Sequence, residues 1–373
     1  MALKRLEFLD SLRGLAAIYV IVYHMLHIPQ PNLEAPRWAF HVAHWGGTGV
    51  TLFFVVSAFS LFYTMPLRLK EERPSLSFYL HRLCRIAPLF YLWIVLSLMR
   101  DRLLFSVSHP LWSILATGGF VFNFIPGFQE GIVWAGWTIG VEILFYALFP
   151  LIYRRVRSVW EAWTLVLVCV SAWMLFQPLI AHLPLAAELK KPLLSQWFFL
   201  RHLPIFAYGA VCYFLLRDRI ASEVGKRLRS VGLFLVPLVA SAYMATISGW
   251  LGKGFADAYY WQGFIYGSLL VALALNPLKL IVNGVTCYLG KLSYSLYLNH
   301  PTVVLLLSPV YRKIYTAAPN VSVAFLASYA LTLAIVVAVS SVTYRFVEEP
   351  GIRLGKRLYR AWGPRQTNLA IAR

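Results

Sequence analysis

The chain has 373 residues, of which 60% are hydrophobic and only 13% are charged, with a mean hydropathy of +0.66. This composition excludes a soluble globular domain and predicts a protein whose solvent is the lipid bilayer. A formal net charge of +19 would indicate a nucleic-acid partner in a soluble protein. Here Lys and Arg lie in short clusters between apolar runs of spanning length, so we interpret the charge as a determinant of topology and expect no nucleic-acid partner.

The cysteines and the N-terminus add two further expectations. The four cysteines lie far apart, with neither a CxxC pair nor zinc-ligand spacing, at positions 84, 169, 212 and 287. They therefore predict neither a disulfide framework nor a metal site. The charged N-terminus leads into an apolar run without a small-residue cleavage motif, so we expect the first helix to be retained.

Apolar runs of spanning length follow one another along the chain. The ten predicted spans are 8–28, 46–65, 86–104, 134–153, 160–182, 197–216, 230–249, 259–280, 287–308 and 322–346. A further run, 111–126, is short and ends in Asn123 and Pro126, so its length does not decide whether it crosses. The sequence thus predicts an all-α, polytopic integral membrane protein with about ten transmembrane helices.

The distribution of basic residues decides between the possible topologies. With ten spans and a cytoplasmic N-terminus, the inside segments collect 24 of the 34 Lys and Arg, the outside segments collect nine, and Lys291 lies within a span. If 111–126 also crossed, the inside count would fall to 14 against 19 outside. The positive-inside rule therefore favours ten spans with both termini cytoplasmic, and leaves 105–133 as an outer loop or a re-entrant segment. Since no loop exceeds about 30 residues, we expect 1–373 to form one transmembrane domain without a fused soluble domain.

Few ionisable residues fall inside the predicted spans, and each is a candidate for function because burying a charge in a bilayer costs roughly 2.5 to 3.5 kcal/mol. The first span carries Arg13 and, eleven residues later, His24, which on a helix places them on nearly the same face and about 16 Å apart. Glu142 lies near the middle of the fourth span, and Asn299 and His300 lie in the ninth. A neutral, hydrogen-bonded packing role is an equally good interpretation for a lone intramembrane histidine, whereas a mid-membrane carboxylate needs a proton or a partner.

Arg82 and Arg85 are three residues apart in the segment HRLCR at 81–85, so they share one side of a helix that enters the membrane. Two guanidinium groups in this position can bind phosphates. On this motif alone, a role in topology or in binding lipid headgroups is the better explanation.

Six segments, in order along nearly the whole chain, resemble the membrane acyltransferase 3 family. They are LDSLRG at 9–14 continuing to His24, GVTLFFVVS at 49–57, the segment with Arg82 and Arg85, WTIGVEILFY at 137–146, LGKLSYSLY at 289–297 with His300, and EEP at 348–350. Two positions depart from the family pattern: Ala58 stands where a glycine is usual, and Ile143 where many members carry a second glutamate. Glu142 is therefore the one carboxylate of that motif.

The resemblance implies transfer of an acyl group, most often acetyl, from cytosolic acyl-coenzyme A to a hydroxyl of a cell-surface or exported carbohydrate. It also implies a bacterial inner membrane as the location, with membrane lipids and a carbohydrate or glycolipid acceptor as partners. Some members act on small molecules such as macrolides, and others carry a fused extracytoplasmic domain. We expect this chain to work alone or with a separate extracytoplasmic partner. Its oligomeric state is not predicted.

Residue roles follow as hypotheses from this resemblance. Arg13, Arg82 and Arg85 would bind the coenzyme A phosphates. His24 would act as general base on the acceptor hydroxyl, with a transient acyl-histidine as the rival route, and Glu142 would orient the imidazole if the helices bring the two within hydrogen-bond reach.

Three further residues would contact the substrate: Trp137, Tyr297 and His300. Aromatic side chains at these depths are more often part of the interfacial aromatic belt.

A transporter or flippase also has many helices and intramembrane ionisable groups, so composition does not exclude it. The absence of a visible inverted repeat and the ordered set of acyltransferase-like segments count against that alternative. A purely structural membrane scaffold would leave the buried His, Glu and Arg unexplained.

Overall fold

The computed structural model describes residues 5–182, 190–220, 225–251 and 258–362, and its regular structure within these ranges is entirely helical. The helices are α1 (Glu7–His27), α2 (Phe40–His44), α3 (Gly49–Arg68), α4 (Pro74–Phe105), α5 (Leu111–Gly118), α6 (Trp137–Arg155), α7 (Val159–His182), α8 (Lys190–Trp197), α9 (Phe199–Ile220), α10 (Lys226–Ile247), α11 (Ala258–Leu275), α12 (Gly284–Lys291), α13 (Ser293–Ala317), α14 (Val321–Thr343) and α15 (Glu349–Trp362). Short 3₁₀ turns lie at Gly46–Thr48 and Phe122–Phe124, and a π-helical turn at Tyr344–Glu348 joins α14 to α15.

Eight helical segments of the described residues are long and apolar enough to cross a bilayer. They contain α1, α3, α4, α6, α7, α9, α10 and α14, while α11 and α13 correspond to the two remaining predicted spans. The expectation of an all-α polytopic membrane protein is confirmed, and the count of ten spans is approximate. Large apolar side chains on the outer surface, such as Leu103, Trp160 and Leu175, are 74% to 77% exposed, which suits contact with lipid.

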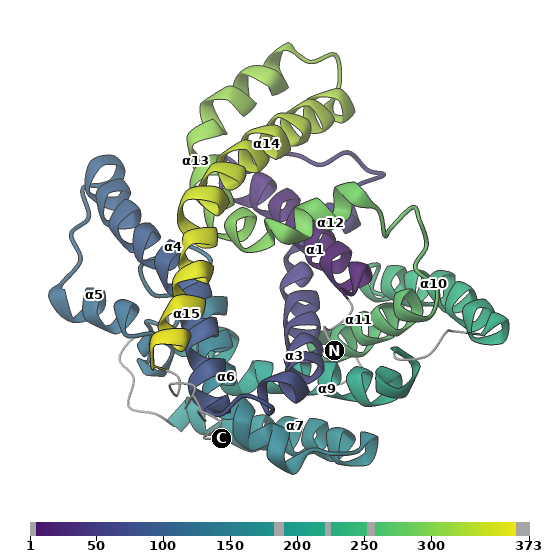
Figure 1. Ribbon diagram of the computed structural model, residues 1–373. Coiled ribbons are helices and arrows are strands. Elements are labelled where there is room, and N and C mark those ends of the chain that lie inside the picture. Colours follow the sequence, from purple (N-terminus) through teal and green to yellow (C-terminus); the bar gives the residue numbers. More distant parts are fainter. Residues whose placement is uncertain (1–4, 183–189, 221–224, 252–257, 363–373) are drawn as a thin grey trace, which may run out of the picture.

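The chain assembles around a central group of helices that contact one another: α1, α3, α9 and α11 (Figure 1). Large side chains such as Phe59, Phe62 and Phe206 are fully buried between these helices. On one side α13 and α14 form a long hairpin, and on the other α7 packs against α9. Because α1 and α3 are buried over most of their length, polar groups on them face protein rather than lipid.

The predicted span 287–308 is divided in the structure. It ends as α12 at Lys291 and continues as α13 from Ser293, with Leu292 at the junction. The physical reason is a close crossing with α1: a Cβ atom added to Gly290 would lie 1.8 Å from the Asp10 carbonyl oxygen. Asn283 also caps α12, and its side chain accepts hydrogen bonds from the Val285 and Thr286 amides. The break between α12 and α13 thus lies next to the close approach of α12 to α1 at Gly290.

The short run 111–126 does not form a membrane-crossing helix. Its only α-helix, α5, has eight residues and rises about 12 Å, far less than the roughly 30 Å hydrocarbon core. The Asn123 side chain donates to the Trp197 carbonyl and accepts from the Phe199 amide, both at 2.8 Å. The segment is therefore tied to the junction of α8 and α9, on the side of the molecule where α4 ends.

At the other end of the chain, α15 lies along α4 (Figure 1). Gly351 and Gly355 face Cys84 at this contact, with a hypothetical Cβ of Gly351 only 2.5 Å from the Cys84 carbonyl oxygen. The apolar run at 322–346 therefore does not end the helical structure. The close glycine contact holds the helical turns of α4 that carry Arg82 and Arg85.

Candidate active site

A cavity opens between α1, α3, α4, α6 and α13. Its wall contains three arginines, Arg13, Arg82 and Arg85, and one carboxylate, Glu142. The three predicted phosphate-binding residues thus meet in one cavity although they come from two helices. Three guanidinium groups against one carboxylate favour an anionic ligand.

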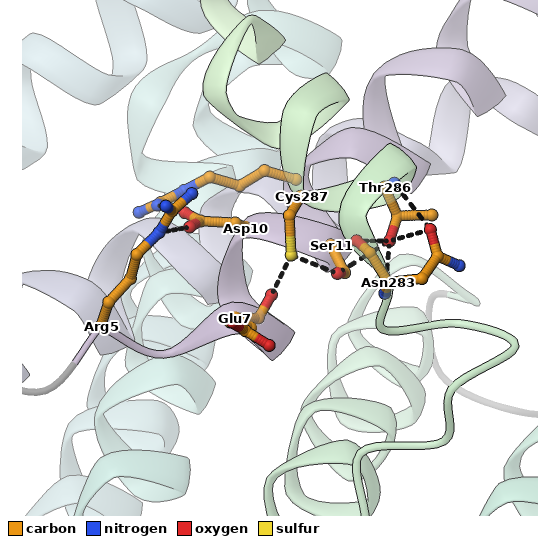
Figure 2. Close-up of polar contacts among 8 residues, drawn as sticks. Arg5, Glu7, Asp10, Ser11, Asn283, Thr286 and Cys287 are labelled. Atoms are coloured by element: carbon orange, nitrogen blue, oxygen red, sulfur yellow. Dashed lines mark hydrogen bonds and ion pairs between the residues drawn. The ribbon is translucent and has the colours of Figure 1, made fainter.

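Arg13 is positioned from the α1 side of the cavity. Its guanidinium donates a 2.7 Å hydrogen bond to Ser60 Oγ on α3 and lies 3.6 Å from the Asp10 carboxylate. Asp10 also accepts a 2.8 Å hydrogen bond from Arg5 (Figure 2). Asp10 therefore holds Arg13 in place, one turn away along the same helix.

The crossing with α12 fixes this part of α1. Ser11 accepts a 2.9 Å hydrogen bond from Thr286 and lies 3.3 Å from Cys287 Sγ, which also approaches the Glu7 carbonyl oxygen (Figure 2). A Cβ on Gly14 would meet the Thr286 carbonyl oxygen at 2.5 Å. The small residues of α1 and α12 thus let the two backbones approach closely enough for these contacts.

Arg82 and Arg85 line the cavity without forming an ion pair with any carboxylate in the described ranges. The Arg82 guanidinium lies 5.5 Å from the centroid of the Tyr146 ring, in a cation–π arrangement. The buried carboxylate of Glu348 accepts a 2.9 Å hydrogen bond from Ser295 and also interacts electrostatically with Arg85. Neither guanidinium is in direct contact with a carboxylate of the described residues, so both can still bind a ligand in this cavity.

Glu142 is held by two hydroxyl groups. Its Oε1 atom accepts hydrogen bonds from Ser57 at 2.6 Å and from Tyr146 at 2.5 Å. These contacts link α3 to α6 and place the carboxylate in the wall of the arginine-lined cavity. Tyr146, four residues after Glu142 on the same helix face, was not assigned from the sequence, although the i, i+4 spacing could have indicated it.

His24 and His300 lie against each other. His24 Nδ1 is 3.1 Å from His300 Nε2 and 3.0 Å from the Val20 carbonyl oxygen, and His300 Nδ1 is 3.2 Å from the Leu296 carbonyl oxygen. His300 is fully buried, whereas His24 is partly exposed. The predicted base therefore has a histidine as its hydrogen-bond partner, and the hydrogen bonds of Glu142 go to Ser57 and Tyr146.

The Val20 and Leu296 carbonyl oxygens determine which ring nitrogens of this histidine pair carry the protons. A carbonyl oxygen accepts but never donates, so both Nδ1 atoms carry hydrogen and both Nε2 atoms carry lone pairs. His24 Nδ1–H is then shared between the Val20 carbonyl and the His300 Nε2 lone pair. The consequence is that His24 Nε2 has a free lone pair and can take a proton.

Tyr297 lies between the cavity and the histidine pair. It lines the cavity, and its ring centroid is 5.7 Å from the His300 ring and 5.7 Å from Phe53. His300 follows one turn later on α13, and His24 lies eleven residues beyond Arg13 on α1, about 16 Å along the helix. Tyr297 thus contacts both the arginine-lined cavity and the histidine pair.

Trp137 does not line this cavity. Its ring packs against Trp197, with centroids 4.1 Å apart, and against His202 at 5.1 Å. The following residue, Thr138, lines the cavity instead. A role for Trp137 in substrate binding stays a prediction.

Comparison with known proteins identifies the class of this site. The family model described as an acyltransferase domain matches residues 6–345. The chain belongs to the acyltransferase 3 family. It is an integral membrane acyltransferase, and the resemblance inferred from the six sequence segments is confirmed.

The curated proteins that match this chain have low sequence identity to it. O-acetyltransferase OatA of Staphylococcus aureus is 23% identical over 380 residues, covering 93% of this chain and 57% of that protein. Acyltransferase MdmB of Streptomyces mycarofaciens is 26% identical over 241 residues, or 58% of this chain and 59% of the relative. The ORF330 protein of Acidianus two-tailed virus is 24% identical and aligns over 78% of this chain and 81% of its own length. The alignments thus span somewhat more than half of OatA and MdmB. No solved structure matches the chain.

Proposed function

We propose that this acyltransferase moves an acyl group, most simply acetyl, from acyl-coenzyme A at the cytosolic face to a hydroxyl of a cell-surface or exported carbohydrate. The observation that carries the proposal is the cavity in which Arg13, Arg82 and Arg85 converge with a single carboxylate. Bidentate guanidinium contacts suit the phosphates of coenzyme A. The relative OatA is an O-acetyltransferase, which supports acetyl transfer to oxygen.

The orientation in the membrane follows from charge. Arg82 and Arg85 lie in the first half of α4, which begins just after the end of α3 that carries Arg68, and Arg13 lies in the first half of α1. The positive-inside rule assigns this end, which also carries Arg154 and Arg155 on α6, to the cytosol. We propose a bacterial inner membrane with both termini cytoplasmic, although residues 1–4 and 363–373 lie outside the described ranges. Coenzyme A thioesters are made on that side.

His24 is proposed as the general base. Its Nε2 lone pair removes the proton from the acceptor hydroxyl while the oxygen attacks the thioester carbonyl carbon. The carbon–sulfur bond then breaks, and the departing thiolate takes the proton back from His24 Nε2. During the step the Nδ1–H of the imidazolium remains hydrogen-bonded to His300 Nε2 and the Val20 carbonyl, both of which stabilise the positive charge.

The other predicted site residues divide between the two substrates. Glu142, fixed by Ser57 and Tyr146 in the wall of the arginine cavity, is proposed to act on the donor side. Tyr297 lines the cavity and contacts the His300 ring, and is proposed to contact the acyl arm. The acceptor hydroxyl reaches the partly exposed face of His24.

The test uses the purified full-length protein in detergent with radiolabelled acetyl-coenzyme A. Wild type is expected to release free coenzyme A and to label a surface-polysaccharide precursor. His24→Ala is expected to lower label transfer at least a hundredfold while donor binding is retained, since general base catalysis contributes about 10²- to 10⁴-fold. Arg85→Ala is expected to raise the donor KM with a smaller effect on kcat.

Two results would refute the proposal. If wild type binds no acyl-coenzyme A, the donor assignment is wrong. If His24→Ala keeps full transfer, the base is another residue.

A further inference from the structure

A second cavity opens between the last turns of α3, α6 and α9 and the first turn of α4. Three arginines line it: Arg154, Arg157 and Arg217. No carboxylate is among the described residues that line it, and the nearby Asp218, 3.5 Å from Arg217, has a side chain that is 83% exposed. The described lining is therefore strongly positive and suits a phosphate group.

The two cavities lie along the same three helices. On α3 the lining residues move from Ser57 in the first cavity to Met65 in the second. At 1.5 Å per residue, this displacement is about 12 Å along the helix axis. The second cavity lies toward the end of α3 that carries Arg68.

The other two helices give a displacement in the same direction. On α6 the lining moves from Tyr146 to Pro150 and Tyr153, and on α4, which runs the opposite way, from Arg82 back to Ser75. These steps are about 6 to 10 Å along the helix axes. The three helices agree in direction, so the second cavity lies beyond the first along them and closer to the proposed cytosolic face.

The wall of the second cavity also contains aromatic rings. Tyr153, Tyr213 and Phe214 line it beside the arginines, and the Arg217 guanidinium lies 5.2 Å from the centroid of the Phe214 ring. A planar heteroaromatic base can stack on such rings, and a phosphate can bind the adjacent guanidinium groups. A phosphorylated nucleoside combines both groups in one ligand.

We propose that this second cavity binds the adenosine 3′-phosphate end of the coenzyme A donor, an inference that rests on the proposed function. The order of sites matches the order of groups in that molecule. The 3′-phosphate and adenine bind among Arg154, Arg157, Arg217 and the aromatic rings, and the diphosphate binds Arg13, Arg82 and Arg85. The flexible pantetheine arm then passes Tyr297 toward His24.

The experiment compares two donors that differ in one phosphate group: acetyl-coenzyme A and acetyl-3′-dephospho-coenzyme A. Free thiol release by the purified full-length protein gives kcat/KM for each. Because charge-assisted hydrogen bonds to a phosphate are strong, wild type is expected to prefer acetyl-coenzyme A by about tenfold to a hundredfold. The triple variant Arg154→Gln, Arg157→Gln, Arg217→Gln is expected to reduce this ratio toward one.

Matched variants separate this role from a general effect of charge. Arg155 is exposed and adjacent to Arg154 but does not line the cavity, so Arg155→Gln is expected to keep the wild-type ratio. Arg157 and Arg217 also contact backbone carbonyl oxygens, so the single variant Arg154→Gln is measured as well. This single variant is expected to lower the ratio of the two kcat/KM values, but by less than the triple variant does.

The outcomes distinguish this inference from the proposed function. If wild type turns over both donors equally, or if the variants lose both donors in parallel and keep the ratio, the nucleotide site is wrong while the acyltransferase proposal stands. If wild type releases no thiol from acetyl-coenzyme A, the proposed donor itself is wrong. A ratio that falls in Arg155→Gln as much as in Arg154→Gln would also overturn the site.

Discussion

His24 carries a free lone pair on Nε2 because its other ring nitrogen already has two acceptors. The Val20 carbonyl oxygen lies in the preceding turn of α1, and His300 Nε2 is supplied by α13. The buried His300 is itself fixed by the Leu296 carbonyl oxygen. A base that is oriented in this way needs no tautomer change before it takes a proton.

His300 is therefore predicted to act through His24 as a positioning residue. His300→Ala removes one acceptor of the His24 Nδ1–H, so we expect kcat to fall about tenfold to a hundredfold with little change in the donor KM. His300→Gln offers a side-chain oxygen as acceptor and is expected to restore part of kcat. Thiol-release kinetics measure both variants, with thermal unfolding as a control for folding. If Gln is no better than Ala in a protein of wild-type stability, the positioning role is wrong.

At the scale of the element, the crossing of α1 and α12 decides where Asp10 and Arg13 lie. The two helices approach so closely that Gly14 and Gly290 each face backbone atoms of the partner helix. Asp10, which holds Arg13, is the residue whose carbonyl oxygen faces Gly290. A disturbance of this crossing therefore reaches the arginine cluster directly.

Gly290→Ala is predicted to destabilise the protein and to weaken donor binding. The added methyl group would overlap the Asp10 carbonyl oxygen, and overpacking of this kind typically costs about 1–3 kcal/mol. Gly284→Ala, on the same helix with open space around its Cβ position, is the matched control. Thermal unfolding in detergent and the donor KM measure the two effects. Equal unfolding temperatures for the two variants would show that the crossing is not tightly packed.

At the scale of the whole molecule, the arginine-lined cavities and the histidine pair lie at different depths. The second cavity lies at the proposed cytosolic end, the first cavity lies deeper along α3 and α6, and His24 lies about 16 Å from Arg13 along α1. The segment that contains α5 and Asn123 lies at the opposite end of α4 and is tied to the junction of α8 and α9. This arrangement would let the proposed donor and acceptor approach from opposite faces of the membrane.

This topology predicts the accessibility of single cysteines. In a variant with all four native cysteines replaced by serine, Lys70→Cys and Arg155→Cys are expected to resist a membrane-impermeant thiol reagent in intact cells and to react after permeabilisation. Ser108→Cys, exposed in the loop after α4, is expected to react without permeabilisation. The reverse pattern would place the arginine cavities outside the cell and refute a cytosolic donor.

Much of the site was predictable because its signals are local. The spacing of Arg82 and Arg85 predicted one helix face, and both line the same cavity. Arg13, Glu142 and Tyr297 line it too, although the sequence had led us to expect Glu142 beside His24 and Tyr297 beside the acceptor. Ser57 and Tyr146 were missed because hydroxyl groups in a span carry no hydropathy signal as strong as a charge.

The sequence by itself determined that this protein is a helical membrane protein of the acyltransferase 3 family, because hydropathy, charge clusters and motifs are properties of neighbouring residues. Only the tertiary structure decided that His24 meets His300, 276 residues away, and that the predicted span 287–308 is divided at Leu292. Such contacts depend on how closely helices distant in the chain pack. That packing is set by side-chain volumes and glycine positions on several helices at once.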